Sequence, residues 1–187
     1  WWVHGPAPID ELEDFSRRAT LPGAEASWRA AAGVDGLGWV RLDGVVWPAG
    51  RQLVHLATTL SSPSEQPVAV RLGAAQAARV WLNGQEVLTT PHPLSRAEDQ
   101  ATGGGWLAPG PNLLVVAVAS ERDDWWLRVR LTAPDGGPLS GLVELAVPPE
   151  PRPPVDRRPP VVRSLEGELT RAVEAGRQCA MTALAAA

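Results

Sequence analysis

The sequence predicts a mainly β protein: an antiparallel β-sandwich, then a proline-rich segment and a C-terminal α-helix. Three observations support this prediction. Short apolar runs bounded by turn-forming residues recur along residues 1–147. Two of these runs are joined by Asn83-Gly84, the dipeptide that most strongly favours a tight hairpin turn. A helix-forming composition begins only at Ser164, after a stretch dense in proline.

The expected strands follow one another along the chain. They span residues 39–43, 53–60, 68–73, 79–82, 85–88, 113–119 and 125–131. Alternation places nine apolar side chains between the two sheets, namely Val70, Leu72, Val80, Leu82, Leu114, Val116, Leu127, Val129 and Leu131. Residues 90–105 are expected to form a long loop, because they contain two prolines and three successive glycines.

Sixteen residues follow a pattern built around the Trp-Leu-Asn-Gly turn and a later Leu-x-x-Gly-x-Asn-x-Leu segment. They are Val70, Leu72, Gly73, Val80, Trp81, Leu82, Asn83, Gly84, Val87, Leu107, Gly110, Asn112, Leu114, Val116, Trp126 and Arg130. In these residues the chain resembles the galactose-binding-domain-like jelly rolls, and in particular the non-catalytic sugar-binding domain at the N-terminus of family-two glycoside hydrolases. The opening Trp2–Pro6 fits as well, although Ala7 stands where an aromatic residue is usual. The resemblance covers about residues 1–137.

The resemblance implies a jelly-roll β-sandwich of about eight strands, galactose-binding-like, with an N-terminal arm. It further implies a non-catalytic accessory module of a larger bacterial protein, with a structural or interaction role and with carbohydrate as a candidate ligand. The alternative is a non-catalytic domain of a glycoside hydrolase whose catalytic domain lies outside this chain. A cell-envelope or secreted location would suit either role. One sandwich hosts many functions, so the resemblance bears on the fold more than on the function.

The C-terminal part of the chain changes composition twice. Seven of the sixteen residues 147–162 are proline, which favours an extended linker over residues 148–162. Residues 163–187 are expected to form an amphipathic helix with Ser164 as its N-cap, because Leu165, Leu169, Val173 and Leu184 recur at helical spacing. One such helix cannot bury its apolar face alone, so it is interpreted as the start of a truncated helical domain. The expected partner is that domain or another protein.

Composition excludes several classes of function. The formal net charge of −4 argues against a nucleic-acid surface, and no apolar run is long enough for a membrane span. No dinucleotide, phosphate-loop or zinc-protease motif occurs, so neither a cofactor nor an enzymatic activity is expected. His92, Glu98 and Asp99 could be imagined as metal ligands, but their spacing fits no standard site and a solvated loop is the favoured interpretation.

The candidate ligand-binding residues come from strand alternation. Trp81, Trp126, Arg71, Arg128 and Arg130 are expected to point away from the core of the sandwich. If that face is open, indoles and fixed guanidinium donors form a shallow platform suited to a sugar. If it is covered, the two tryptophans hold the N-terminal arm or the helical domain to the sheet. The covered arrangement is the favoured interpretation.

Overall fold

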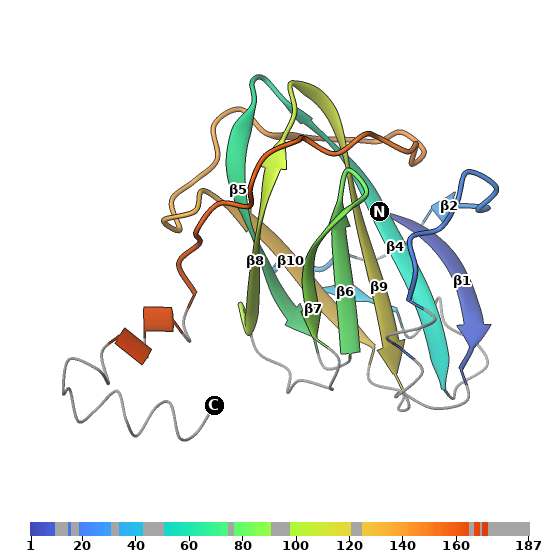
Figure 1. Ribbon diagram of the computed structural model, residues 1–187. Helices are drawn as coiled ribbons and strands as arrows, with labels where there is room; N and C mark the ends of the chain where they lie inside the picture. The colour runs from blue at the N-terminus through green and yellow to red at the C-terminus, as the bar shows by residue number, and fades with distance from the viewer. Residues whose placement is uncertain are drawn as a thin grey trace.

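In the computed structural model of the protein (Figure 1), the described residues are 1–9, 15, 19–30, 34–42, 51–74, 77–90, 98–120, 125–164, 167–168 and 170–171. Within them the chain forms eleven strands. These are β1 (Trp2–Pro8), β2 (Arg29–Ala30), β3 (Val40–Arg41), β4 (Gln52–Ser62), β5 (Gln66–Ala74), β6 (Ala77–Leu82), β7 (Gln85–Thr90), β8 (Ala101–Leu107), β9 (Gly110–Ser120), β10 (Trp126–Thr132) and β11 (Val143–Leu145).

The strands make two antiparallel sheets that face each other. Sheet A has the order β2-β1-β4-β9-β6-β7, with β11 also paired to β4, and sheet B has the order β3-β10-β5-β8. From β3 to β10, every connection except the β6–β7 hairpin passes from one sheet to the other. The four-stranded orders β4-β9-β6-β7 and β3-β10-β5-β8 are those of a jelly roll. The predicted fold class is confirmed.

The core lies between the two sheets, as the alternation of apolar residues predicts. Seven of the nine predicted side chains are buried, with exposed fractions of 0–2%, and the other two, Val129 and Leu131, are partly buried and pack against the same cluster. Long complementary strands such as β4 and β9, which pair from Gln52 to Ser62, align the inward-facing side chains over their whole length. Each buried aliphatic side chain contributes about 1.5–3 kcal/mol through burial.

The predicted hairpin turn is confirmed and is reinforced by a pair of buried amides. Asn83 and Gly84 have φ angles of +51° and +81°. The Asn83 side chain accepts from the Leu113 N–H at 2.9 Å and donates to Asn112 Oδ1 at 2.7 Å. Asn112 in turn bonds to main-chain groups of Ala108 at 2.7 and 2.9 Å. The two asparagines of the sequence pattern therefore join the β6–β7 turn to the start of β9.

The prediction of a loop over residues 90–105 is wrong for Thr90 and for residues 101–105, and residues 91–97 lie outside the described residues. β7 extends to Thr90, and β8 runs through the three glycines, pairing with β5 from Ala101 to Leu107. The glycines are needed because other atoms come close. A Cβ on Gly103 would collide with the Val87 carbonyl, and one on Gly105 would lie 3.0 Å from side-chain carbons of Leu82 and Val87. Glycine here signals close packing inside a strand.

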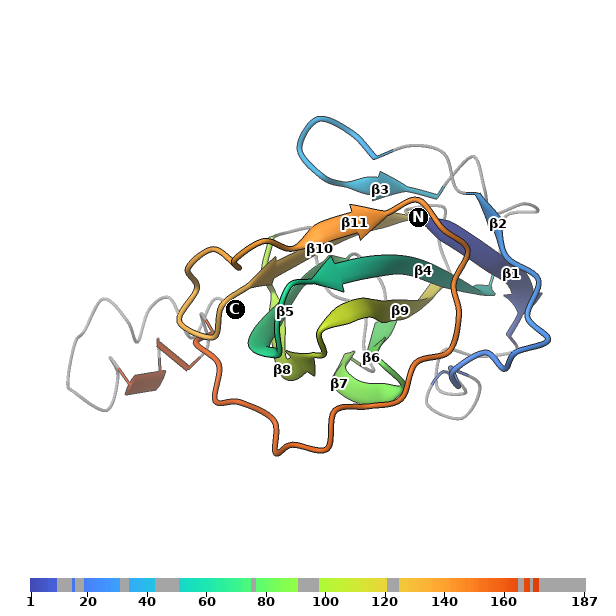
Figure 2. The same ribbon diagram turned by 90° about the horizontal axis from the view of Figure 1, so that it is seen from above.

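The outer face of sheet A is covered by the N-terminal arm. A second apolar cluster there includes Phe15 and Ala19 of the arm, together with Trp28, which is partly buried. A second segment also lies on the outside of the sandwich. Residues 146–164, near the C-terminal end of the chain, curve around it past β6, β7 and β8 (Figure 2). Arm and C-terminal segment approach each other beside Gly84, around a cavity of about 80 Å³ lined in part by Trp28 and Pro149.

The predicted N-cap of the C-terminal helix is confirmed, because Ser164 Oγ accepts from the Gly167 N–H at 3.0 Å. Leu165, Leu169, Val173 and Leu184, on which the amphipathic pattern rests, lie outside the described residues. The extended linker over 148–162 and the helical domain after it stay predictions. In the part of the chain that the structure describes, no helix has the length and apolar character needed to cross a membrane.

Candidate functional site on the outer face of sheet B

The structure brings four of the five predicted site residues together and separates the fifth. Arg71 lies on β5, and Trp126, Arg128 and Arg130 lie on β10, so all four belong to sheet B. Trp81 belongs to β6 of sheet A, where it is 6% exposed and packs in the cluster under the N-terminal arm. Because the two sheets face each other, the outward side of sheet A cannot form one surface with the outward side of sheet B.

Strand register builds the face around β10. Leu127, Val129 and Leu131 point into the core, so the alternate residues of β10 point outward. Arg130 is opposite Arg71 on β5, and Trp126 is opposite Arg41 on β3. The face therefore carries arginines from three neighbouring strands around one tryptophan.

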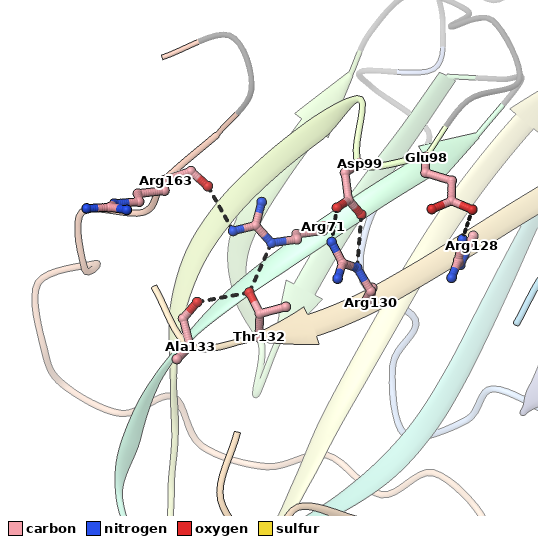
Figure 3. A network of polar contacts seen from close by, with 8 residues as sticks. All are labelled: Arg71, Glu98, Asp99, Arg128, Arg130, Thr132, Ala133 and Arg163. Carbon is pink, nitrogen blue, oxygen red and sulfur yellow. Dashed lines mark hydrogen bonds and ion pairs between the residues drawn. The ribbon is translucent and has the colours of Figure 1, made fainter. Parts of the chain in front are cut away.

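Two carboxylates hold the arginines of β10 in place (Figure 3). Arg130 makes a two-point contact with Asp99, through Nε to Oδ1 at 3.3 Å and through Nη2 to Oδ2, and Arg128 pairs with Glu98. The hydrogen bond to Asp99 raises the pKa of Arg130, so its charge is retained. Asp99 has a φ of +52°, a conformation that aspartate tolerates better than most residues and that turns the chain into β8.

The imagined metal site does not gain support from this arrangement. Glu98 and Asp99 contact arginines, and His92 lies outside the described residues. Among the residues that the structure describes, no group of three or more potential metal ligands gathers.

Arg71 has a different environment from the arginines of β10. It is 7% exposed, and its Nε donates to Thr132 Oγ1 at 2.9 Å while its Nη2 donates to the carbonyl of Arg163 at 2.9 Å (Figure 3). Both of these contacts are to neutral oxygens, one of them on the C-terminal segment. Arg71 is occupied in holding that segment, and the open part of the face lies around β10 and β3.

Trp126 is the partly exposed aromatic residue of this open part. The guanidinium of Arg41 lies 4.6 Å from its ring centroid, and Trp39 meets it edge to face at 6.4 Å with an interplanar angle of 86°. Arg128 in turn lies 6.0 Å from the Trp39 ring. Such contacts fix the orientation of the rings and the guanidinium groups.

Sequence reasoning missed Arg41 as a member of this surface and Trp39 as the buried ring that packs against Trp126. The sequence contained the signal for their placement. Trp39 and Arg41 flank Val40 in the predicted strand 39–43, and because Val40 is buried in the core, alternation places both on the other side of the strand. The name β10 surface is used here for the outward residues Trp126, Arg128, Arg41 and Arg130 together with the paired carboxylates of Glu98 and Asp99. It offers one indole, several fixed donors and two carboxylate acceptors within one side of a sheet.

A comparison with solved structures finds several that are similar to this chain at low sequence identity. Solved structures similar to this chain include a family 35 carbohydrate binding module from an environmental isolate, with 17% identity, a TM-score of 0.39, and coverage of 79% of this chain and 99% of that one. The CBM35 of Paenibacillus barcinonensis has 16% identity and a TM-score of 0.35, over 55% of this chain and 84% of that one. A β-glucosidase from Kluyveromyces marxianus has 11% identity and a TM-score of 0.47, over 71% of this chain but 16% of that one.

No family model matches the sequence, and no curated protein matches it either. The chain spans only 13–16% of the length of the β-glucosidase structures. The family 35 modules and the β-glucosidases share 11–17% identity with the chain, at TM-scores of 0.35–0.47.

Proposed function

We propose that this chain is a non-catalytic accessory module of a larger protein and that it binds carbohydrate through the β10 surface. The observation that carries the proposal is that Trp126 and two carboxylate-paired arginines, Arg128 and Arg130, stand on the outward side of one strand. An indole face can stack on the apolar face of a sugar ring. Guanidinium donors and carboxylate acceptors can then share hydrogen bonds with the hydroxyls around it.

The geometry favours a weak but preorganised site. The ion pairs with Glu98 and Asp99 restrict the arginine rotamers before any ligand arrives, so less entropy is lost on binding. The side chains of Glu98 and Arg130 are 60% and 47% exposed, so the surface is open to water, as expected for a ligand that is itself well hydrated. A dissociation constant in the millimolar to micromolar range is expected, which corresponds to about −4 to −8 kcal/mol.

A non-catalytic role also suits the chemistry of the β10 surface. Glycoside hydrolysis requires one carboxylic acid to donate a proton while a second carboxylate faces it across the scissile bond. Glu98 and Asp99 are adjacent in sequence and each accepts from an arginine. In the alternative form of the proposal, the module belongs to a glycoside hydrolase whose catalytic domain lies outside this chain, and the rest of the gene would encode that domain.

The proposal is tested by titrating the full chain with a panel of neutral and acidic oligosaccharides, using calorimetry and tryptophan fluorescence. Trp126→Ala should weaken binding at least tenfold and leave the melting temperature within a few degrees of the original. Trp81→Ala is the matched control, because that indole is buried under the arm; it should cost about 3–5 kcal/mol of stability. Absence of binding to every sugar, or binding unchanged in Trp126→Ala, would overturn the assignment.

A second candidate function is a structural one, in which the module docks its own C-terminal helical domain or a protein partner. It is favoured by the position of the predicted helix start. Ser164 follows directly on Arg163, whose carbonyl accepts from Arg71 and whose N–H donates to the Pro134 carbonyl at 2.8 Å. A helical domain that begins there would be held close to sheet B.

A further inference from the structure

The outer face of β5 and β8 is covered by residues 157–163, here called the strap. The indole Nε1 of Trp106 donates to the carbonyl of Arg158 at 2.9 Å. At the other end of the strap, Arg71 donates to the carbonyl of Arg163 at 2.9 Å. Figures 1 and 2 both show the C-terminal segment passing over this part of the sandwich. Two side chains of the sheet therefore hold two main-chain carbonyls that are five residues apart.

The middle of the strap lies on a glycine that the sandwich itself does not explain. Gly103 and Gly105 face inward, where Val87 and Leu82 leave no room for a Cβ. Gly104 faces outward, and a Cβ on it would lie 2.6 Å from the carbonyl oxygen of Pro160 and 3.2 Å from two of its ring carbons. Glycine in the interior of a strand is destabilising relative to alanine, because it loses more backbone freedom on folding. At position 104 this cost is offset by the close approach of the proline.

Side chains of the strap add contacts of their own. The guanidinium of Arg157 lies 5.3 Å from the Trp106 ring centroid, and its Nε donates to Glu65 Oε1 at 2.6 Å. Arg157 is 55% exposed and Glu65 37% exposed, so this ion pair contributes specificity more than stability. Trp106 is thus contacted at its ring by an arginine and at its N–H by the next residue's carbonyl.

These contacts match the way in which extended proline-rich peptides are recognised. Proline restricts the chain to an extended form before binding and leaves no N–H to satisfy, so recognition relies on aromatic contacts and on donors to peptide carbonyls. Here the aromatic residue and first donor is Trp106, the shallow floor is Gly104, and the second donor is Arg71. We propose that the surface formed by Trp106, Gly104 and Arg71 is a binding site for an extended peptide with an arginine–proline-proline core. The strap is its resident ligand, exchangeable for a peptide of the same chemistry.

The test uses the full chain with a weakened strap. Pro159→Gly together with Pro160→Gly removes the rings and the preference for an extended conformation, while Trp106, Gly104 and Arg71 are kept. The probe is a fluorescein-labelled peptide with the sequence of residues 155–163, followed by fluorescence polarisation. The peptide should bind the weakened-strap chain at least tenfold more tightly than the unmodified chain, because in the latter the tethered strap competes at a local concentration of about millimolar. A peptide with both prolines changed to glycine is the control and should lose most of this affinity.

Variants of Gly104 and Trp106, made in the weakened-strap chain, decide where the peptide binds. Gly104→Val should abolish binding, and Trp106→Phe, which keeps an aromatic ring but removes the N–H donor, should weaken it about fivefold or more. If Gly104→Val does not fold, Trp106→Phe still tests the site. Trp126→Ala should leave peptide binding unchanged, so failure here is separate from failure of the carbohydrate assignment. Failure of the peptide to bind the weakened-strap chain, or binding indifferent to Trp106→Phe, would overturn the proposal.

Discussion

Acid should destabilise this protein through one buried histidine. His55 stands on the outward side of β4, under the N-terminal arm, and is 8% exposed. Its Nε2 donates to the carbonyl of Thr20 at 2.9 Å, so the ring helps to hold the arm. Burial lowers the pKa of His55 from its ordinary value of 6.5 to about 4, the hydrogen bond to Thr20 acts in the opposite direction, and His4, whose ring lies 6.0 Å away, lowers it slightly further.

The sign and size of the effect follow from proton linkage. Above pH 6.5 the histidine is neutral in both the folded and the unfolded chain, and it contributes no pH dependence. Between pH 6.5 and about 4 the unfolded chain binds a proton that the folded chain does not, so the free energy of unfolding falls by about 1.4 kcal/mol per pH unit. The whole loss is about 3 kcal/mol, and it is complete below the pKa of the folded state.

The assay is urea unfolding at pH 7, 6, 5 and 4 for the original chain and for His55→Gln. The glutamine amide can still donate to the Thr20 carbonyl but does not titrate in this range. Carboxylates also lose their ion pairs as the pH falls, and they do so in both proteins, so only the difference between the two curves reports on His55. The difference should grow to about 3 kcal/mol in favour of His55→Gln at pH 4. Parallel curves would refute the reasoning, and His4→Gln should keep most of the original slope.

Three further predictions concern stability and can be checked by thermal and urea unfolding. Thr59→Val should stabilise by about 1 kcal/mol, because this buried hydroxyl has no hydrogen-bond partner among the residues that the structure describes. Thr58→Val should destabilise, because Thr58 donates to Glu144 at 2.6 Å, and effects of the same sign in the two variants would contradict this reasoning. Asn112→Ala should cost about 3–5 kcal/mol, since a fully buried side chain loses four hydrogen bonds, and a cost near zero would mean that the amide pair is dispensable. Gly84→Val should cost about 1 kcal/mol or more through strain at a φ of +81°, and an unchanged melting temperature would argue against that strain.

The fold was largely predictable because its signals are local. Alternation in each strand separated core residues such as Val70 and Leu114 from outward ones, and Asn83-Gly84 fixed the hairpin. The strand through Gly103 was missed for a physical reason. Sequence rules treat successive glycines as a loop. Here each glycine lies so close to an atom distant in sequence, such as the Val87 carbonyl or the Pro160 ring, that a Cβ would not fit. Those contacts exist only after the sheets and the strap have come together.

The candidate site was only partly predictable, because alternation gives the side of a strand and not the sheet that contains it. Trp81 and Trp126 both point outward, yet β6 and β10 lie in opposite sheets. The jelly-roll strand order would have separated them, since it divides β3–β10 into two fixed sets of four. The carboxylates that pair with Arg128 and Arg130 come from Glu98 and Asp99, just before a strand that the sequence did not reveal.

The residues that carry the sequence resemblance explain the sandwich far better than they explain a ligand. The side chains of Asn83 and Asn112 form hydrogen bonds with each other and with main-chain groups, and Trp81 is buried under the arm. The groups that distinguish this chain's surface lie mostly outside the pattern: Arg41 on the indole of Trp126, the Glu98-Asp99 pair, and the strap on Trp106. A change of ligand within this fold would therefore require changes in those segments and not in the turn. Experiments on binding should begin with them.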